Sequence, residues 1–336
     1  MENTDEQLAV ANIEENPSMA QDAIIYPPKF EKPEQAANIW FRSIVSLGLY
    51  LLIGYYIFHS FAMLVMITAI VMFHELGHFA AMKYFRYKDL GIFFIPLLGA
   101  YVQGTKREVS QKESAIILLA GPLPGIIIGI ILYLLYQNNP FLSIAGISYY
   151  TISLSLIILN LINLFPVYPL DGGQLLNRVF LDEEGWISKA FVVLSAGLLC
   201  WFAWKNNFYI LYIFPLMMLL RLTGDSKMKS VEKKLEESGI DMDKSYEELP
   251  DKDYWTIRNI LIENMATLKD VNPAPPYEYS HKEERIMTLI QSLLHRHLVQ
   301  DVSLAGKIFI LLIWVTAIAS PWLLNIDMYF LHRFGL

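Results

Sequence analysis

Long apolar runs dominate the pattern of the chain, and most of them carry almost no charge. A run of about 18 or more such residues is typical of a helix that crosses about 30 Å of hydrocarbon. The runs predict an all-α polytopic membrane protein with about six to seven transmembrane helices. They lie at residues 40–58, 61–82, 114–136, 147–165, 187–204, 208–222 and 307–324.

Two places in this pattern need a separate interpretation. Only His59 and Ser60 separate the first two runs, and we expect a tight turn there, because one helix through both would be about twice too long for a bilayer. The stretch 90–102 is too short for two spans, too apolar for a free loop, and rich in β-forming residues. We expect strands or a re-entrant hairpin there, a short membrane-associated β segment whose edge holds a substrate by strand addition. The alternative is a hydrophobic loop pressed on the membrane.

Lysine and arginine residues orient the spans. They gather in the segment 83–112 and again after residue 222, whereas the segment 137–146 carries no charge. Loops rich in Lys and Arg stay in the cytoplasm. We therefore expect a multi-pass cell-membrane protein whose amino terminus and residues 225–306 are cytoplasmic.

Polar composition separates three further regions from the apolar core at 40–224. Residues 1–39 are acidic and contain several prolines, which predicts a mostly flexible cytoplasmic arm. Residues 225–306 predict a small helical cytoplasmic segment, in which 284–299 has an amphipathic stripe that packs on itself or lies against the membrane. Residues 307–336 hold the last transmembrane helix and a short tail.

The overall composition indicates which classes of partner the chain binds. The chain is 54% hydrophobic with a formal net charge of -7, and no basic stripe interleaved with aromatic residues is present. We therefore expect the lipid bilayer as a partner and no nucleic acid. Cys200 is the single cysteine, so no internal disulfide forms.

The motif HELGH at residues 74–78 lies inside the second apolar run. Positions four apart share one face of a helix, so His74 and His78 can bind one metal ion together. Glu75 projects near the same ion and can accept a proton from a water molecule there. An alternative is an ordinary exposed helix, but the apolar flanks argue against it, because ionisable groups within a span are costly and mark functional sites.

Two histidines do not complete a catalytic zinc site, which usually takes three protein ligands. Glu108 is one candidate for the third ligand, but it lies in the basic loop and can pair there. Asp171 is the better candidate. It follows a span that Pro166 and Pro169 end, and two glycines follow it, so its carboxylate can be placed on irregular backbone at membrane depth. The alternative for Asp171 is a plain cytoplasmic turn.

Three motifs together resemble the site-2 protease family of intramembrane zinc metalloproteases: HELGH at 74–78, AGPLPG at 120–125 and NLFPVYPLDGG at 163–173. Their order and their placement on three separate spans are also similar. The resemblance covers roughly 61–222, so the metalloprotease core would be 40–224. It implies that His74, His78 and Asp171 bind one Zn²⁺ per chain, that Glu75 is the general base, and that Asn163 steadies the peptide or the oxyanion. No PDZ or CBS module is evident.

The function that we expect from these residues is hydrolysis of peptide bonds in a transmembrane protein or peptide substrate. Such a helix must unwind before it is cut, so substrates should carry helix-weakening residues. One alternative is a polytopic metal transporter, which does not need Glu75 and usually has paired repeat halves. Another is an inactive membrane scaffold of the same fold, which needs none of the site residues. The oligomeric state stays open at this point.

Overall fold

The computed structural model describes residues 26–31, 39–58, 60–96, 99–106, 109–181, 185–242, 244–294 and 298–326. The chain forms two compact units, which we call the membrane unit (Glu34–Ser226 and His295–Leu336) and the polar unit (Met1–Pro33 and Lys227–Leu294). The polar unit ends at Leu294, whereas we expected the cytoplasmic segment to extend to residue 306. The reason is that β6 (Leu298–Val299) pairs in parallel with β3 (Val109–Ser110) of the membrane unit.

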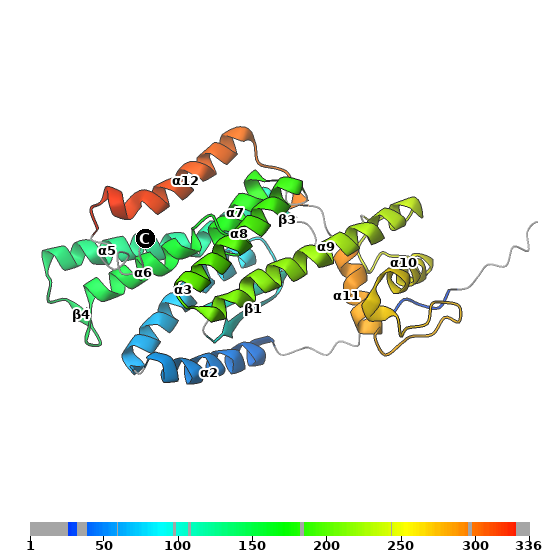
Figure 1. Cartoon of the computed structure of the whole chain (residues 1–336), viewed down its shortest axis with the longest axis horizontal. Coiled ribbons are helices and arrows are strands. Elements are labelled where there is room, and N and C mark those ends of the chain that lie inside the picture. Colours follow the sequence, from blue (N-terminus) through cyan, green and yellow to red (C-terminus); the bar gives the residue numbers. More distant parts are fainter. Residues whose placement is uncertain are drawn as a thin grey trace, which may run out of the picture. The chain divides into compact units, whose positions relative to one another are not determined.

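Apolar helices build the membrane unit, and the expected polytopic helical fold is confirmed (Figure 1). Five described segments are long and apolar enough to span a bilayer, and two apolar helices are shorter. The five are α2 (Ile39–Phe58), α3 (Phe61–Tyr84), α4 (Gln111–Ala120) with α5 (Pro122–Asn138), α8 (Trp186–Lys205) and α12 (Leu304–Leu323). The shorter two are α6 (Tyr149–Asn163) and the segment Tyr209–Leu220, which contains η2 (Tyr209–Tyr212) and the start of α9 (Ile213–Glu237).

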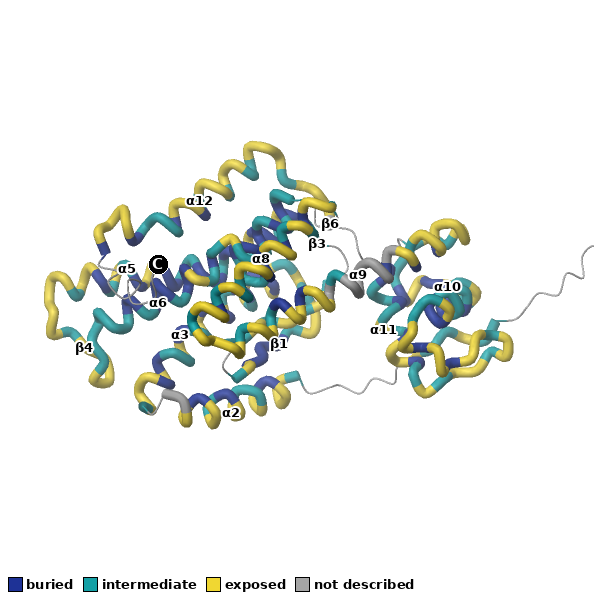
Figure 2. Tube along the Cα trace, viewed as in Figure 1, coloured by how far each residue is buried: buried dark blue, intermediate teal, exposed yellow. Residues whose placement is uncertain are grey.

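The first two spans are separate helices, as the short polar gap predicts. Ser60 caps α3, because its side chain accepts a hydrogen bond from the backbone N–H of Met63. Much of α2 and α12 is exposed, as the yellow parts of both tubes in Figure 2 show, and many of the exposed side chains are large and apolar. Such surfaces are rare on soluble monomers and suit contact with lipid. They include Trp40, Ile44 and Leu52 on α2, and Phe309 and Leu312 on α12.

The apolar stretch after α3 forms an antiparallel hairpin of β1 (Lys88–Ile95) and β2 (Gly99–Thr105). The expected β segment is therefore confirmed, and the alternative of a hydrophobic loop is wrong. Helix α2 packs on this hairpin: the Tyr50 and Phe94 rings lie 5.5 Å apart, and Phe94 N–H donates to Ser46 Oγ at 3.1 Å. This contact occupies part of the β1 backbone.

Glycines let α5 approach α6 closely, and Figure 1 shows the two helices side by side. A Cβ at Gly129 would lie 2.7 Å from Ile157 Cγ1, and one at Gly125 would lie 2.2 Å from Asn160 Nδ2. Small residues at such spacing allow tight helix packing within membranes. A short hairpin of β4 (Ser143–Ile144) and β5 (Ile147–Ser148) joins the two helices.

The polar unit has its own hydrophobic core, built by the end of α9, α10 (Asp251–Asn264), η3 (Ala266–Leu268) and α11 (Glu283–Leu293). The expected apolar stripe of α11 faces this core, because Ile286, Ile290 and Leu293 are buried in it. Of the two alternatives for the stripe, packing within the unit therefore holds. Residues 26–31 also lie on this unit, which differs from the flexible arm expected for 1–39.

Candidate metal centre

Helix α3 brings two imidazole rings together within the membrane unit. His74 and His78 are one helical turn apart, and both are buried, with 7% and 8% of their surface exposed. Their Nε2 atoms face each other at 3.0 Å. Glu75, the next residue on α3, is buried to a similar degree.

A tight fold of the chain places Asp171. Helix α6 ends at Asn163, and α7 (Asp171–Leu175) begins with Asp171 itself. A Cβ at Gly172 would lie 2.0 Å from Leu164 O, so only glycine lets α7 fold back onto the end of α6. The π-helical turn η1 (Leu176–Phe180) continues α7.

Helix α12 supports the same turn from outside the region of family resemblance. Trp314 Nε1–H donates to Leu164 O at 2.8 Å, and both groups are buried. A carbonyl at the end of a helix has no partner within that helix. Trp314 therefore satisfies a polar atom at the start of the segment that carries Asp171.

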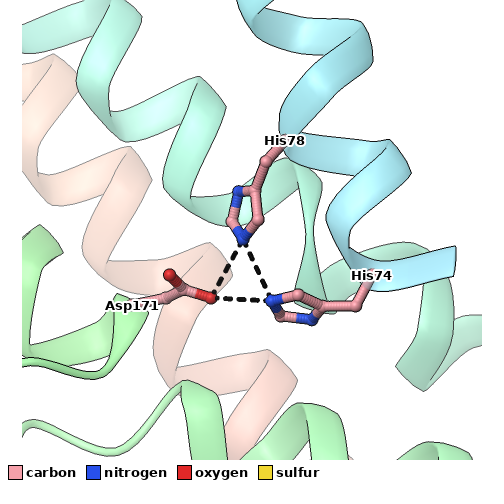
Figure 3. Close-up of side chains that lie close together, drawn as sticks. All are labelled: His74, His78 and Asp171. Carbon is pink, nitrogen blue, oxygen red and sulfur yellow. Dashed lines mark hydrogen bonds and ion pairs between the residues drawn. The ribbon is translucent and has the colours of Figure 1, made fainter. Parts of the chain in front are cut away.

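The three side chains converge on one point, as the close-up in Figure 3 shows. Asp171 Oδ2 lies 3.1 Å from His74 Nε2 and 3.3 Å from His78 Nε2. Among the described residues, these three form the one group of His, Cys, Asp or Glu side chains with ligand atoms all within 4.8 Å of one another.

The outer nitrogens of the two rings decide their tautomers. Asn160 Nδ2 donates to Leu156 O at 2.7 Å, so Asn160 Oδ1 is the end that meets His74 Nδ1 at 2.8 Å. His74 Nδ1 must therefore donate. His78 Nδ1 lies 2.7 Å from Ile117 O and must donate as well. In a neutral ring with Nδ1 protonated, Nε2 carries a free lone pair.

The centre thus consists of three acceptors that face one another. Asp171 Oδ2 is buried and accepts no hydrogen bond from the residues that the structure describes. Buried acceptors without donors are costly unless a cation binds them. Two imidazole nitrogens and one carboxylate oxygen are a usual ligand set of catalytic zinc, with one position left for water or substrate. The residues present therefore fit Zn²⁺.

The break between α4 and α5 closes the centre on one side. A Cβ at Gly77 would lie 2.0 Å from Ala120 O, and one at Gly121 would lie 2.3 Å from His78 Nε2. Any larger residue at either position would push α3 away from α4 and α5. The motif AGPLPG therefore shapes the space around the histidines.

The other candidate residues lie differently. Asn163 Nδ2 donates to Leu159 O of its own helix at 3.2 Å, and its predicted role in substrate binding stays a prediction. Glu108 lies outside the described residues. Asn160, by contrast, contacts His74 directly and was missed from the sequence. Its signal was a polar side chain inside an apolar span.

Sequence comparisons match part of the membrane unit to a known peptidase family. Residues 62–149 match the model of peptidase family M50, and the match includes both histidines but ends before Asp171. The chain is 31% identical over 130 residues to zinc metalloprotease MJ0392 of Methanocaldococcus jannaschii, covering 38% of this chain and 37% of that protein. It is 28% identical over 155 residues to stage IV sporulation protein FB of Bacillus subtilis, covering 46% and 52%. The chain thus spans about a third to a half of the length of these relatives.

One solved structure, a site-2 protease from Methanocaldococcus jannaschii, matches with a TM-score of 0.38 and 24% identity. The match covers 57% of this chain and 92% of that one. The sequence matches thus show that residues 62–149 are similar to peptidase family M50, and that parts of the chain are similar to a zinc metalloprotease and to a sporulation protein.

Proposed function

We propose that this chain is an intramembrane zinc metalloprotease that hydrolyses peptide bonds of membrane-protein substrates. The observation that carries the proposal is the convergence of three buried acceptors, His74, His78 and Asp171, beside Glu75 on an apolar helix. When bound by these three residues, Zn²⁺ would polarise the scissile carbonyl and acidify a water molecule.

Glu75 is the residue that moves the protons. Its carboxylate accepts a proton from the attacking water and returns it to the leaving amine, as a general base and then a general acid. The residue is only 6% exposed, which limits its contact with bulk water. Asn163 would turn its amide from Leu159 O toward the developing oxyanion and donate a hydrogen bond to it.

The outer edge of β2 is the proposed place for the substrate backbone. The hairpin has two strands, and α2 contacts β1 through Ser46 and Phe94. No described strand pairs with the other side of β2. A substrate helix that has unwound near its cleavage site has free backbone groups, which a strand edge can pair.

The proposed orientation keeps the amino terminus and residues 225–306 in the cytoplasm. Single cysteines at positions 141 and 240, in a chain with Cys200→Ser, test it with a membrane-impermeant thiol reagent. Phe141 is 93% exposed in the turn between α5 and α6, and the neighbouring Pro140 is exposed too, so a cysteine at position 141 is accessible to the reagent. Position 141 should react on intact cells and position 240 only after permeabilisation; the reverse pattern overturns the orientation.

The decisive test of the activity compares membrane-protein fragments in cells that carry the native chain or Glu75→Gln. Fragments that require the native chain should disappear in Glu75→Gln, because general acid–base groups contribute about 10²–10⁴-fold to such reactions. The exposed Glu236→Gln is the matched control and should keep every fragment. Zinc should stay bound in both variants. Full cleavage by Glu75→Gln would instead support the transporter or scaffold alternatives.

A further inference from the structure

A short segment of the amino-terminal arm lies on the surface of the polar unit. Residues 26–31 read Tyr-Pro-Pro-Lys-Phe-Glu and form neither helix nor strand. None of the six is buried, whereas Trp255 beneath them is 1% exposed and belongs to the core of the unit. The segment therefore lies on the outside of a core that other residues form.

Aromatic side chains hold the backbone of this segment. Three of its carbonyl oxygens accept hydrogen bonds, each from a different aromatic residue. Proline-rich extended chains have no internal hydrogen bonds, so their carbonyls are free for such donors, and aromatic-lined grooves recognise them in this way. The donors are Trp255 Nε1–H to Pro27 O at 2.9 Å, Tyr279 O–H to Pro28 O, and Tyr246 O–H to Phe30 O at 2.6 Å.

Lys29 adds contacts that depend on its side chain. Its Nζ donates to Glu247 O at 2.7 Å and to Leu249 O at 2.9 Å, and it lies 5.7 Å from the centroid of the Tyr246 ring. Its backbone N–H donates to Asp251 Oδ1 at 2.8 Å. A neutral or shorter side chain would lose the contacts of Nζ but keep the backbone one, so this position selects lysine through Nζ.

Two tyrosine rings of the polar unit contact the aromatic residues near the two ends of the segment. Tyr26 packs edge-on against Tyr277, and Phe30 packs edge-on against Tyr279, both with centroids 5.5 Å apart. Trp255 stacks on Tyr279, with ring centroids 5.8 Å apart. The residues that this surface contacts thus follow the order aromatic, Pro, Pro, Lys, aromatic.

We propose that the polar unit carries a peptide-recognition site for an extended aromatic–Pro–Pro–Lys–aromatic segment, and that residues 26–31 are its resident ligand. The binding joins the arm that precedes α2 to the unit that follows α9, two parts of the chain about 220 residues apart. The tether keeps the segment at a high effective concentration, so a free peptide must be in large excess to replace it. The proposal is independent of the metal centre.

The experiment uses the full chain in detergent with a specific protease site inserted between residues 31 and 39. After the cut, the amino-terminal fragment should remain with the rest of the chain in size-exclusion chromatography. The capped peptide Tyr-Pro-Pro-Lys-Phe-Glu in large excess should release it. A peptide with Lys29→Met should need about 10–100-fold more, because hydrogen bonds from a charged group are lost. A scrambled peptide of the same composition is the control.

A second variant excludes a general loss of structure. Tyr279 is about half exposed, so Tyr279→Phe keeps the ring and removes only the donor to Pro28 O. The fragment and the free peptide both lose this hydrogen bond, so the readout is dilution without peptide: the cut fragment should dissociate at about 2–10-fold higher protein concentration. Loss of the native fragment on cutting, no release by the native peptide, or equal release by the native and scrambled peptides would each overturn the proposal.

Discussion

Each unit of the molecule buries a cluster of ionisable side chains, and the two clusters differ in one respect. In the polar unit, Arg258 and Glu283 are each 1% exposed, and Arg258 Nε–H donates to Glu283 Oε1 at 2.8 Å. Tyr254 O–H donates to the same oxygen at 2.5 Å, and Arg258 Nη2–H donates to Glu283 Oε2 at 3.3 Å. Every acceptor of this cluster meets a protein donor.

The cluster of the membrane unit is built from acceptors alone. His74 and His78 direct their protonated Nδ1 atoms outward, and their Nε2 atoms face Asp171 Oδ2. Burial and charge are therefore shared by both clusters and do not tell them apart. The two clusters differ in their balance of hydrogen-bond donors and acceptors. In a balanced cluster the protein groups satisfy one another, whereas a set of acceptors alone requires a cation.

Removing one partner from the balanced cluster should have the largest effect on stability. Arg258→Met leaves Glu283 buried and without its cation, which typically costs about 3–5 kcal/mol. We expect protection of the α10 and α11 amides against hydrogen exchange to fall by about two to four orders of magnitude. Arg285→Met is the control, because Arg285 is exposed on α11. Unchanged protection in Arg258→Met would show that the pair does not hold the unit together.

The acceptor cluster should respond through zinc affinity. Asn160→Leu keeps the size of the side chain and removes the acceptor for His74 Nδ1–H. Loss of such an outer hydrogen bond typically weakens metal binding by about 10–100-fold, as measured by competition with a chelator. Asn160→Asp keeps an acceptor oxygen there and should retain the affinity. Asn163→Leu should leave zinc binding unchanged and lower turnover; if it is the variant that loses zinc, the roles of the two asparagines are exchanged.

Acidification perturbs the balanced cluster less than a substitution does, because protonation of Glu283 removes its charge but leaves every atom of the side chain in place. Burial alone would raise the pKa of Glu283, but hydrogen bonds from Arg258, Tyr254 and Ser280 N–H lower it below its usual value. The unfolded chain then binds more protons, so this stability is present above about pH 4.3 and is lost as the pH falls further. Protection of α11, corrected for intrinsic exchange, should decrease on acidification, and less so in Glu283→Gln. An increase would contradict the sign.

The sequence revealed the parts of the site that local spacing encodes. His74 and His78 share a helix face, so their convergence follows from the period of the helix. Asp171 could be expected because two prolines and two glycines in a short segment require irregular backbone.

Contacts between segments that lie far apart in the sequence could not be predicted from local spacing. Asn160 lies 86 residues from His74, and nothing near it in sequence identifies its partner. Trp314 likewise meets Leu164 from a helix 150 residues away. The Pro-Pro-Lys segment indicated flexibility because its own composition favours it, while the aromatic residues that bind it lie in the opposite half of the chain.

The most direct test of the central claim is the zinc content of the purified chain and of one charge-neutral variant. We predict one Zn²⁺ per native chain. Asp171→Asn keeps the shape of the side chain but replaces the anionic ligand with a neutral amide, so bound zinc should fall sharply while the protein still inserts and folds. Glu108→Gln should keep its zinc. If Glu108→Gln loses zinc and Asp171→Asn retains it, the three converging acceptors are not the metal site.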